Sequence, residues 1–134
     1  MLVTYPRLGY KLSVATPSVY PVDTSLIAQG EPVSIHTNPK EACQDADIIM
    51  TDTWISMGEE KDQSKRDAFK GYQVTEALGA SAQKDWKFMH CLPRKPFEVD
   101  DYVFNGPRSL IYPQAENRKY SVMAVYELLM RERV

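Results

Sequence analysis

The chain has 134 residues, of which 43% are hydrophobic and 25% are charged. That length suits one hydrophobic core, and the small net charge of −2 predicts neither a nucleic-acid partner nor a membrane-surface partner. No apolar run approaches the length that spans a bilayer, and Cys43 and Cys91 are too far apart for a CxxC metal or redox motif.

Apolar runs alternate with polar, helix-like segments along the chain. Short runs rich in β-branched and apolar residues predict strands at residues 11–16, 33–37, 47–51, 87–91 and 109–113. The segments between and after them predict helices at residues 38–46, 59–71, 75–81, 96–105 and 117–133. The helix at 38 has an N-cap residue, Asn38, followed by Pro39, and the last helix carries apolar residues at core spacing, namely Val122, Val125, Leu128 and Leu129.

This alternation predicts an α/β fold, a Rossmann-like domain with a parallel sheet and helices on both faces. Ligands of such sheets bind beyond the carboxyl ends of the strands. The informative loops are therefore those after residues 51, 91 and 113. The chain has no GxGxxG or Walker-type glycine loop, which argues against a nucleotide site.

The first of these loops is TDTWISMG, residues 51–58. Asp52 and Ser56 follow a buried strand directly, and Gly58 gives the backbone freedom before a charged helix. A carboxylate at a strand end can hold an ammonium group, with a hydroxyl completing the pocket. The alternative is that Asp52 is a turn or cap residue and that the rest of the loop only begins the next helix.

The second loop follows KFMHC and begins at HCLPR. Successive strand side chains point to opposite faces, so His90 and Cys91 should not form a direct catalytic pair. Cys91 is predicted as a thiol at the end of a strand, and the alternative is an inert core cysteine. His90 is predicted as a hydrogen-bonded structural histidine.

The third loop, PQAENRK, contains Arg118. If the closing helix begins at residue 117, Arg118 lies in its first turn, where free N–H groups and the helix dipole favour an anion. The alternative is a surface arginine paired with Glu116 or another acid. Together the three loops offer a carboxylate for an amine, a polarisable thiol and an anion clamp, a set that suits joining an amine to a small phosphorylated molecule.

The segments TDTWISMG, FMHCLPRKPFEVDDYVF and AENRK resemble the ornithine carbamoyltransferases, specifically their C-terminal, ornithine-binding half. The resemblance extends from LGYKLSVATP to the closing helix, so residues 1–134 are expected to form that domain. Aspartate carbamoyltransferases lack the Ser-Met-Gly loop and carry proline at the position of Cys91. Putrescine-type relatives keep HCLP but not SMG, so the combination indicates ornithine.

The resemblance implies transfer of the carbamoyl group from carbamoyl phosphate to the δ-amine of ornithine, giving citrulline and phosphate in arginine biosynthesis or the urea cycle. It implies that Asp52, Ser56 and Met57 bind ornithine. Cys91 is implied as the active-site cysteine, and Cys91, Leu92 and Arg118 as carbamoyl-phosphate contacts. No metal and no organic cofactor is implied.

The resemblance is partial. The family's carbamoyl-phosphate domain, and the first strand of the ornithine domain with the asparagine that follows it, have no counterpart in this sequence. We therefore expect a sheet with an exposed edge or a central gap, and no appreciable turnover by the isolated chain. A non-catalytic ornithine-binding or interaction module is the alternative.

The resemblance also implies partners and a compartment. A homo-oligomer, a trimer in this family, or the missing N-terminal domain is expected to complete the site. The HCLPRKP wording resembles the mitochondrial branch, which implies the mitochondrial matrix, or the cytoplasm if the chain is prokaryotic.

Overall fold

The computed structural model describes residues 2, 4–28, 30–55 and 63–131. The first part of the chain forms α1 (Thr4–Arg7), β1 (Leu12–Ala15), the 3-10 helix η1 (Thr24–Leu26), β2 (Val33–His36) and α2 (Pro39–Ala42). The second part forms β3 (Ile48–Thr51), α3 (Gln63–Ala68), the 3-10 helix η2 (Leu78–Ser81), β4 (Lys87–His90), α4 (Asp101–Asn105) and α5 (Ile111–Arg131). The α/β class with parallel strands is confirmed.

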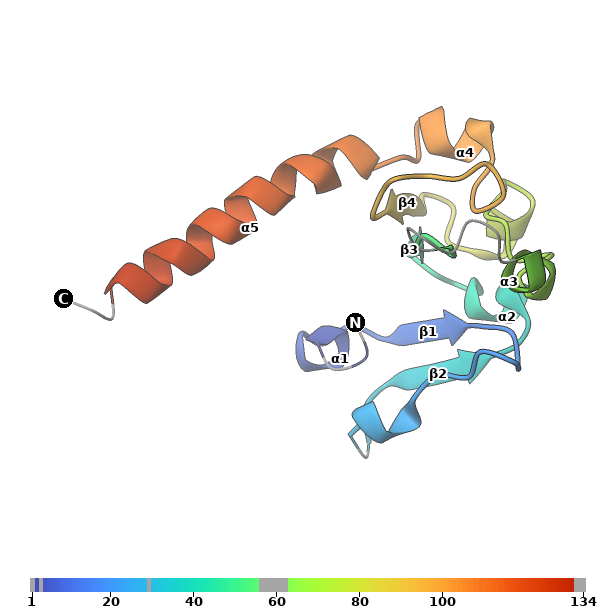
Figure 1. Ribbon diagram of the computed structural model, residues 1–134, viewed down its shortest axis with the longest axis horizontal. Helices are drawn as coiled ribbons and strands as arrows, with labels where there is room; N and C mark the ends of the chain where they lie inside the picture. Colours follow the sequence, from blue (N-terminus) through green and yellow to red (C-terminus); the bar gives the residue numbers. More distant parts are fainter. Residues whose placement is uncertain (1, 3, 29, 56–62, 132–134) are drawn as a thin grey trace.

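The strands form two parallel pairs rather than one continuous sheet. β1 pairs with β2, and β3 pairs with β4, with no hydrogen-bonded ladder between the two pairs in the described ranges. Figure 1 shows the two pairs apart from each other, with β1 on the side of its pair that lies toward β3. This interruption agrees with the expected gap in the sheet.

The predicted fifth strand at 109–113 is wrong. Only Ser109 forms a bridge, to Phe88, and α5 begins at Ile111. Pro113 explains the error. The sequence interpretation took it as the end of a strand, but it is the third residue of helix α5. There it lacks no hydrogen bond, because the first N–H groups of a helix have no intrahelical partner.

Local sequence explains the short helices that frame the strands. Asn38 caps α2 by accepting a hydrogen bond from the Lys40 N–H at 3.0 Å, with Pro39 next, as predicted. α2 ends at Ala42, well before the predicted residue 46. α4 likewise begins only at Asp101, where the Asp100 carboxylate accepts from the Val103 N–H at 2.7 Å.

The hydrophobic core lies around β3 and β4. Among the described residues, it contains nine that are buried: Cys43, Ile49, Val74, Leu78, Trp86, Phe88, Val99, Val103 and Ile111. Phe88 is fully buried in the middle of β4. β1 and β2 have only half-buried and exposed side chains, so the buried core of the described residues lies in the second half of the fold.

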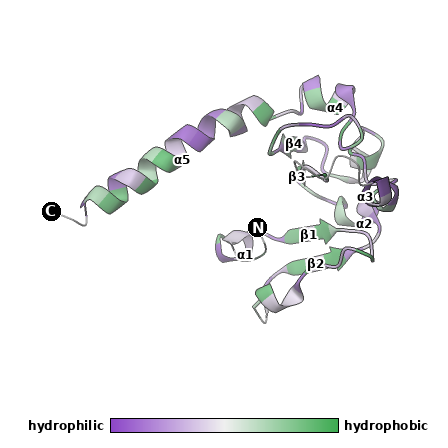
Figure 2. Cartoon of the chain, in the orientation of Figure 1, coloured by the Kyte–Doolittle hydropathy of each residue, from purple (hydrophilic) through white to green (hydrophobic). Residues whose placement is uncertain are grey.

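Helix α5 projects away from this body (Figure 1). Its first residue, Ile111, belongs to the core, but the apolar side chains predicted to face the core, Val122, Val125, Leu128 and Leu129, are 53–62% exposed. That prediction is wrong for this chain, because the described residues place no other element against that part of α5. Figure 2 shows apolar and polar residues interleaved along the exposed length.

Candidate functional site

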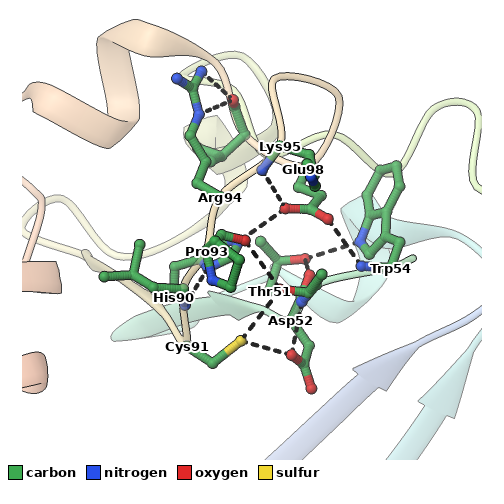
Figure 3. A network of polar contacts seen from close by, with 12 residues as sticks. Thr51, Asp52, Trp54, His90, Cys91, Pro93, Arg94, Lys95 and Glu98 are labelled. Carbon is green, nitrogen blue, oxygen red and sulfur yellow. Dashed lines mark hydrogen bonds and ion pairs between the residues drawn. The ribbon is translucent and has the colours of Figure 1, made fainter. Parts of the chain in front are cut away.

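Asp52 and Cys91 meet where two neighbouring strands end. Thr51 of β3 and His90 of β4 are register partners, so the residues that follow them leave the sheet side by side. The Cys91 thiol donates a hydrogen bond to Asp52 Oδ1 at 2.7 Å (Figure 3). The two residues are 39 positions apart in sequence, and the parallel ladder is what brings them together.

The environment of Cys91 favours the protonated thiol. Burial raises its pKa above the ordinary value, the hydrogen bond to the Asp52 carboxylate raises it further, and contacts with Thr53 lower it by less. Since the thiolate is the nucleophilic form of cysteine, this arrangement does not favour covalent catalysis. It favours a neutral thiol that donates its hydrogen bond to Asp52 and so helps to orient that carboxylate.

Asp52 itself is exposed. Its Oδ1 also accepts the Thr53 N–H at 2.7 Å, so both contacts hold the same oxygen. A carboxylate that is fixed on one side and open to solvent on the other can accept hydrogen bonds from an ammonium group.

Thr53 is a site neighbour that sequence reasoning missed. Its hydroxyl donates to the Pro93 carbonyl at 3.1 Å and lies 3.6 Å from Cys91 Sγ. It therefore joins the loop after β3 to the loop after β4. A hydroxyl two residues beyond a strand end was the available signal.

His90 is structural, as predicted. It is 1% exposed and points away from the half-buried Cys91, toward the buried carboxylate of Glu98. Its Nε2 lies 3.1 Å from Glu98 Oε2, and its Nδ1 accepts the Leu92 N–H at 2.9 Å. Glu98, which is fully buried, was not predicted from the sequence.

Leu92 lies on the exposed side of this loop. Its side chain is 36% exposed and its φ is +60°, in the left-handed region that leucine rarely adopts. Such backbone strain costs about 1–2 kcal/mol and is typical of residues held in place for function. The hydrogen bond from Leu92 N–H to His90 helps to hold this conformation.

Arg118 is not in the first turn of its helix. α5 begins at Ile111, so Arg118 is an exposed residue in the interior of the helix, and the predicted anion site at a helix N-terminus is wrong. Residues two apart on a helix do not face each other, so pairing with Glu116 is not favoured either. One turn before Arg118, Gln114 Oε1 accepts the His90 N–H at 3.0 Å, which ties this part of α5 to the end of β4.

Two predicted ornithine-binding residues, Ser56 and Met57, lie outside the described residues. Within the described ranges, no group of three His, Cys, Asp or Glu side chains could hold a metal ion. No helix in those ranges is long and apolar enough to cross a membrane.

Comparison with known proteins decides the family. The model of the aspartate/ornithine carbamoyltransferase Asp/Orn-binding domain matches residues 1–129. The chain belongs to this family. Among carbamoyltransferase relatives, the mitochondrial ornithine transcarbamylase of Gallus gallus is 43% identical over 141 residues, covering 98% of this chain and 40% of the relative. The mitochondrial ornithine carbamoyltransferase of Aspergillus terreus is 45% identical over 140 residues, covering 95% and 39%.

Solved carbamoyltransferase structures share the fold. The anabolic ornithine carbamoyltransferase of Campylobacter jejuni superposes with a TM-score of 0.86 at 32% identity, covering 98% of this chain and 46% of that one. The mitochondrial enzyme of Coccidioides immitis gives 0.83 at 36% identity, covering 94% and 42%. The chain thus spans about 40% of the length of its curated relatives.

Proposed function

We propose that residues 1–134 are the ornithine-binding part of an ornithine carbamoyltransferase. The observation that carries the proposal is the pairing of an exposed carboxylate, Asp52, with a protonated thiol, Cys91, at adjacent strand ends. The family match and the names of the relatives support ornithine as the amino acid.

In the proposed reaction, the neutral δ-amine of ornithine attacks the carbamoyl carbon of carbamoyl phosphate. A C–N bond forms, the bond from that carbon to the phosphate oxygen breaks, one proton of the amine passes to the departing phosphate, and citrulline and hydrogen phosphate leave. Asp52 would bind the ammonium end of ornithine and help to orient the δ-amine, together with Ser56 and Met57. No step needs a thiolate, which agrees with the raised pKa of Cys91. Catalysis of this kind depends on positioning and on stabilising charge as it develops.

Cys91 and Leu92 would line the junction between the two substrates, at the end of β4. Arg118 would contact carbamoyl phosphate. That role follows from its match to the family motif and from its place one turn beyond Gln114, which binds the β4 end. The position of Arg118 in the interior of α5 means that a helix N-terminus does not support this role.

Further protein is needed to complete this site. We propose that a carbamoyl-phosphate domain and neighbouring subunits, as in a trimer, supply the phosphate-binding groups and cover the exposed apolar side of α5. The relatives named mitochondrial point to the mitochondrial matrix as the compartment.

Titration calorimetry tests the amino-acid specificity. The chain should bind L-ornithine more tightly than L-aspartate or putrescine. Asp52→Asn should weaken ornithine binding about tenfold or more, because a charge-assisted hydrogen bond contributes roughly 1.5–3 kcal/mol. Asp85→Asn, which removes an exposed carboxylate from the loop before β4, is the matched control and should bind normally. Tighter binding of aspartate, or unchanged binding by Asp52→Asn, would refute the proposal.

A second candidate function is a non-catalytic ornithine-binding module. The exposed Asp52 carboxylate favours it, since a carboxylate held beside the protonated Cys91 thiol can bind an amine without any chemical step. A citrulline assay of the purified chain with ornithine and carbamoyl phosphate separates the two candidates. Binding without citrulline supports the module, whereas steady citrulline production shows that the chain is catalytic by itself.

A further inference from the structure

We propose that Glu98 is a positioning residue that holds Asp52 against Cys91. The inference rests on the proposed ornithine site for its functional consequence, although the positioning itself can be measured without ornithine. Glu98 would touch neither substrate and would act only through the two loops that carry the site.

The carboxylate of Glu98 binds both loops at once. Its Oε1 accepts the Trp54 N–H at 2.9 Å, two residues beyond Asp52. Its Oε2 accepts the Lys95 N–H at 2.7 Å and lies 3.1 Å from His90 Nε2. His90 precedes Cys91 in the sequence and Lys95 follows it. Figure 3 shows the carboxylate between the Trp54 backbone and His90, with the Asp52–Cys91 contact on the other side of the His90–Pro93 segment.

The Leu92 N–H fixes which nitrogen of His90 carries the proton. Leu92 N–H donates to Nδ1, so the ring hydrogen is on Nε2 and points at Glu98. Glu98 thus accepts three N–H groups while its side chain is fully buried. A buried carboxylate is stable only when it is saturated with donors in this way, and losing one donor or moving the oxygens is costly.

The same cluster reaches the helix that carries Arg118. The His90 side chain binds Glu98, and its backbone N–H donates to Gln114 of α5 at 3.0 Å. Glu98 and His90 together therefore link the loop after β3, the loop after β4 and α5. The proposed reaction does not use the Glu98–His90 pair directly. The pair is needed to place Asp52, Cys91 and Arg118 relative to one another.

Glu98→Gln is a diagnostic substitution because it keeps the size and removes one acceptor oxygen. If the amide oxygen faces Trp54, the amide nitrogen faces the Lys95 N–H. If it is turned over, the nitrogen faces the Trp54 N–H. Either orientation sets one donor against another, so one loop must move.

The experiment is a double-mutant cycle on Cys91 reactivity. Iodoacetamide alkylation of Cys91 is followed by peptide mass spectrometry across pH in the original chain, Asp52→Asn, Glu98→Gln and the double variant. In the original background, Asp52→Asn should speed Cys91 alkylation at a given pH about three- to tenfold, because the carboxylate disfavours the thiolate. In the Glu98→Gln background, Asp52→Asn should change the rate by less than about twofold.

Two controls separate positioning from general loss of structure. Glu76→Gln removes a carboxylate that pairs with Arg108 at 3.1 Å, away from both loops, and should leave the full effect of Asp52→Asn. Cys43, buried in the core, should stay unreactive in every folded variant. If Glu98→Gln does not fold, Glu98→Asp replaces it, since aspartate withdraws the carboxylate by about 1.5 Å and cannot span both loops.

Loss of the Asp52 effect in the Glu98 variant, with Cys43 still protected, supports the proposal. A full Asp52 effect in that variant overturns it, even if the variant melts at a lower temperature. Ornithine titrations distinguish the two proposals. If the original chain binds ornithine, Glu98→Gln should weaken ornithine binding at least as much as Asp52→Asn does. If Glu98→Gln binds ornithine as tightly as the original chain, Glu98 has no positioning role in binding. If no variant binds ornithine but the Asp52 effect depends on Glu98, the ornithine site fails and the positioning role stands.

Discussion

Replacing Gly79 with alanine should destabilise the fold, although alanine usually stabilises a helical turn. Gly79 lies in η2 and packs on the face of Trp86, which is 2% exposed. A Cβ at this position would lie 2.3 Å from Trp86 Cζ2 and 2.5 Å from Cε2. Carbon atoms pack at about 3.5–4.0 Å, so the indole must move by more than about 1 Å. The Arg108 guanidinium lies over the same ring, 4.9 Å from its centroid, so it must adjust when the indole moves.

The expected cost of this overpacking is about 1–3 kcal/mol. Alanine also lowers the conformational entropy of the unfolded chain, which stabilises the fold by about 0.4–1 kcal/mol. The net loss of about 1–2 kcal/mol corresponds to a fall in Tm of roughly 4–8 °C for a chain of this size. Thermal unfolding followed by circular dichroism measures it. In a Trp86→Phe background, the smaller ring should reduce the cost of Gly79→Ala by about 1 kcal/mol. A higher Tm for Gly79→Ala, or the same cost in both backgrounds, would show that the contact is not what limits this position.

The two cysteines should lower the free energy of unfolding at alkaline pH. Burial raises the pKa of both thiols, and Asp52 raises that of Cys91 further, so the folded chain holds these protons more tightly than the unfolded chain. Their contribution is complete below the ordinary thiol pKa and is lost as pH rises through the folded value, so urea unfolding should give a lower free energy at pH 10 than at pH 7. Cys91→Ser should show a smaller decrease, and an equal decrease would contradict the assignment. Arg94→Lys should cost about 1–2 kcal/mol, because lysine cannot make both guanidinium contacts to the Val99 carbonyl, at 2.9 and 3.3 Å, and stack on Phe104. Arg131→Lys, at a 76% exposed side chain, is the matched control and should leave Tm unchanged.

Much of the site was predictable because it depends on local patterns and one topological rule. The strands at 47–51 and 87–91 are apolar runs with clear ends, and the structure has them within one residue. Parallel pairing then brings Asp52 and Cys91 together, as expected from residues at equivalent strand ends. The opposite directions of His90 and Cys91 also follow from the two-residue period of a strand.

What sequence reasoning missed depends on contacts between distant residues. Glu98 stands in PFEVDD, which reads as the polar face of a helix, and its burial is decided by the Trp54 N–H, 44 residues away. The start of α5 was missed because Pro113 ends a strand and begins a helix equally well. That single misplacement moved Arg118 from the interior of the helix to its first turn.

The exposed length of α5 also sets a condition on measuring any of these quantities. If copies of the chain associated through α5, burial of aliphatic side chains such as Leu128, at 62% exposure, would lower the free energy of the assembly. Ligand affinity and melting temperature are then linked to protein concentration by mass action. A dilution series, extrapolated to the dissociated chain, is what makes values for two variants comparable.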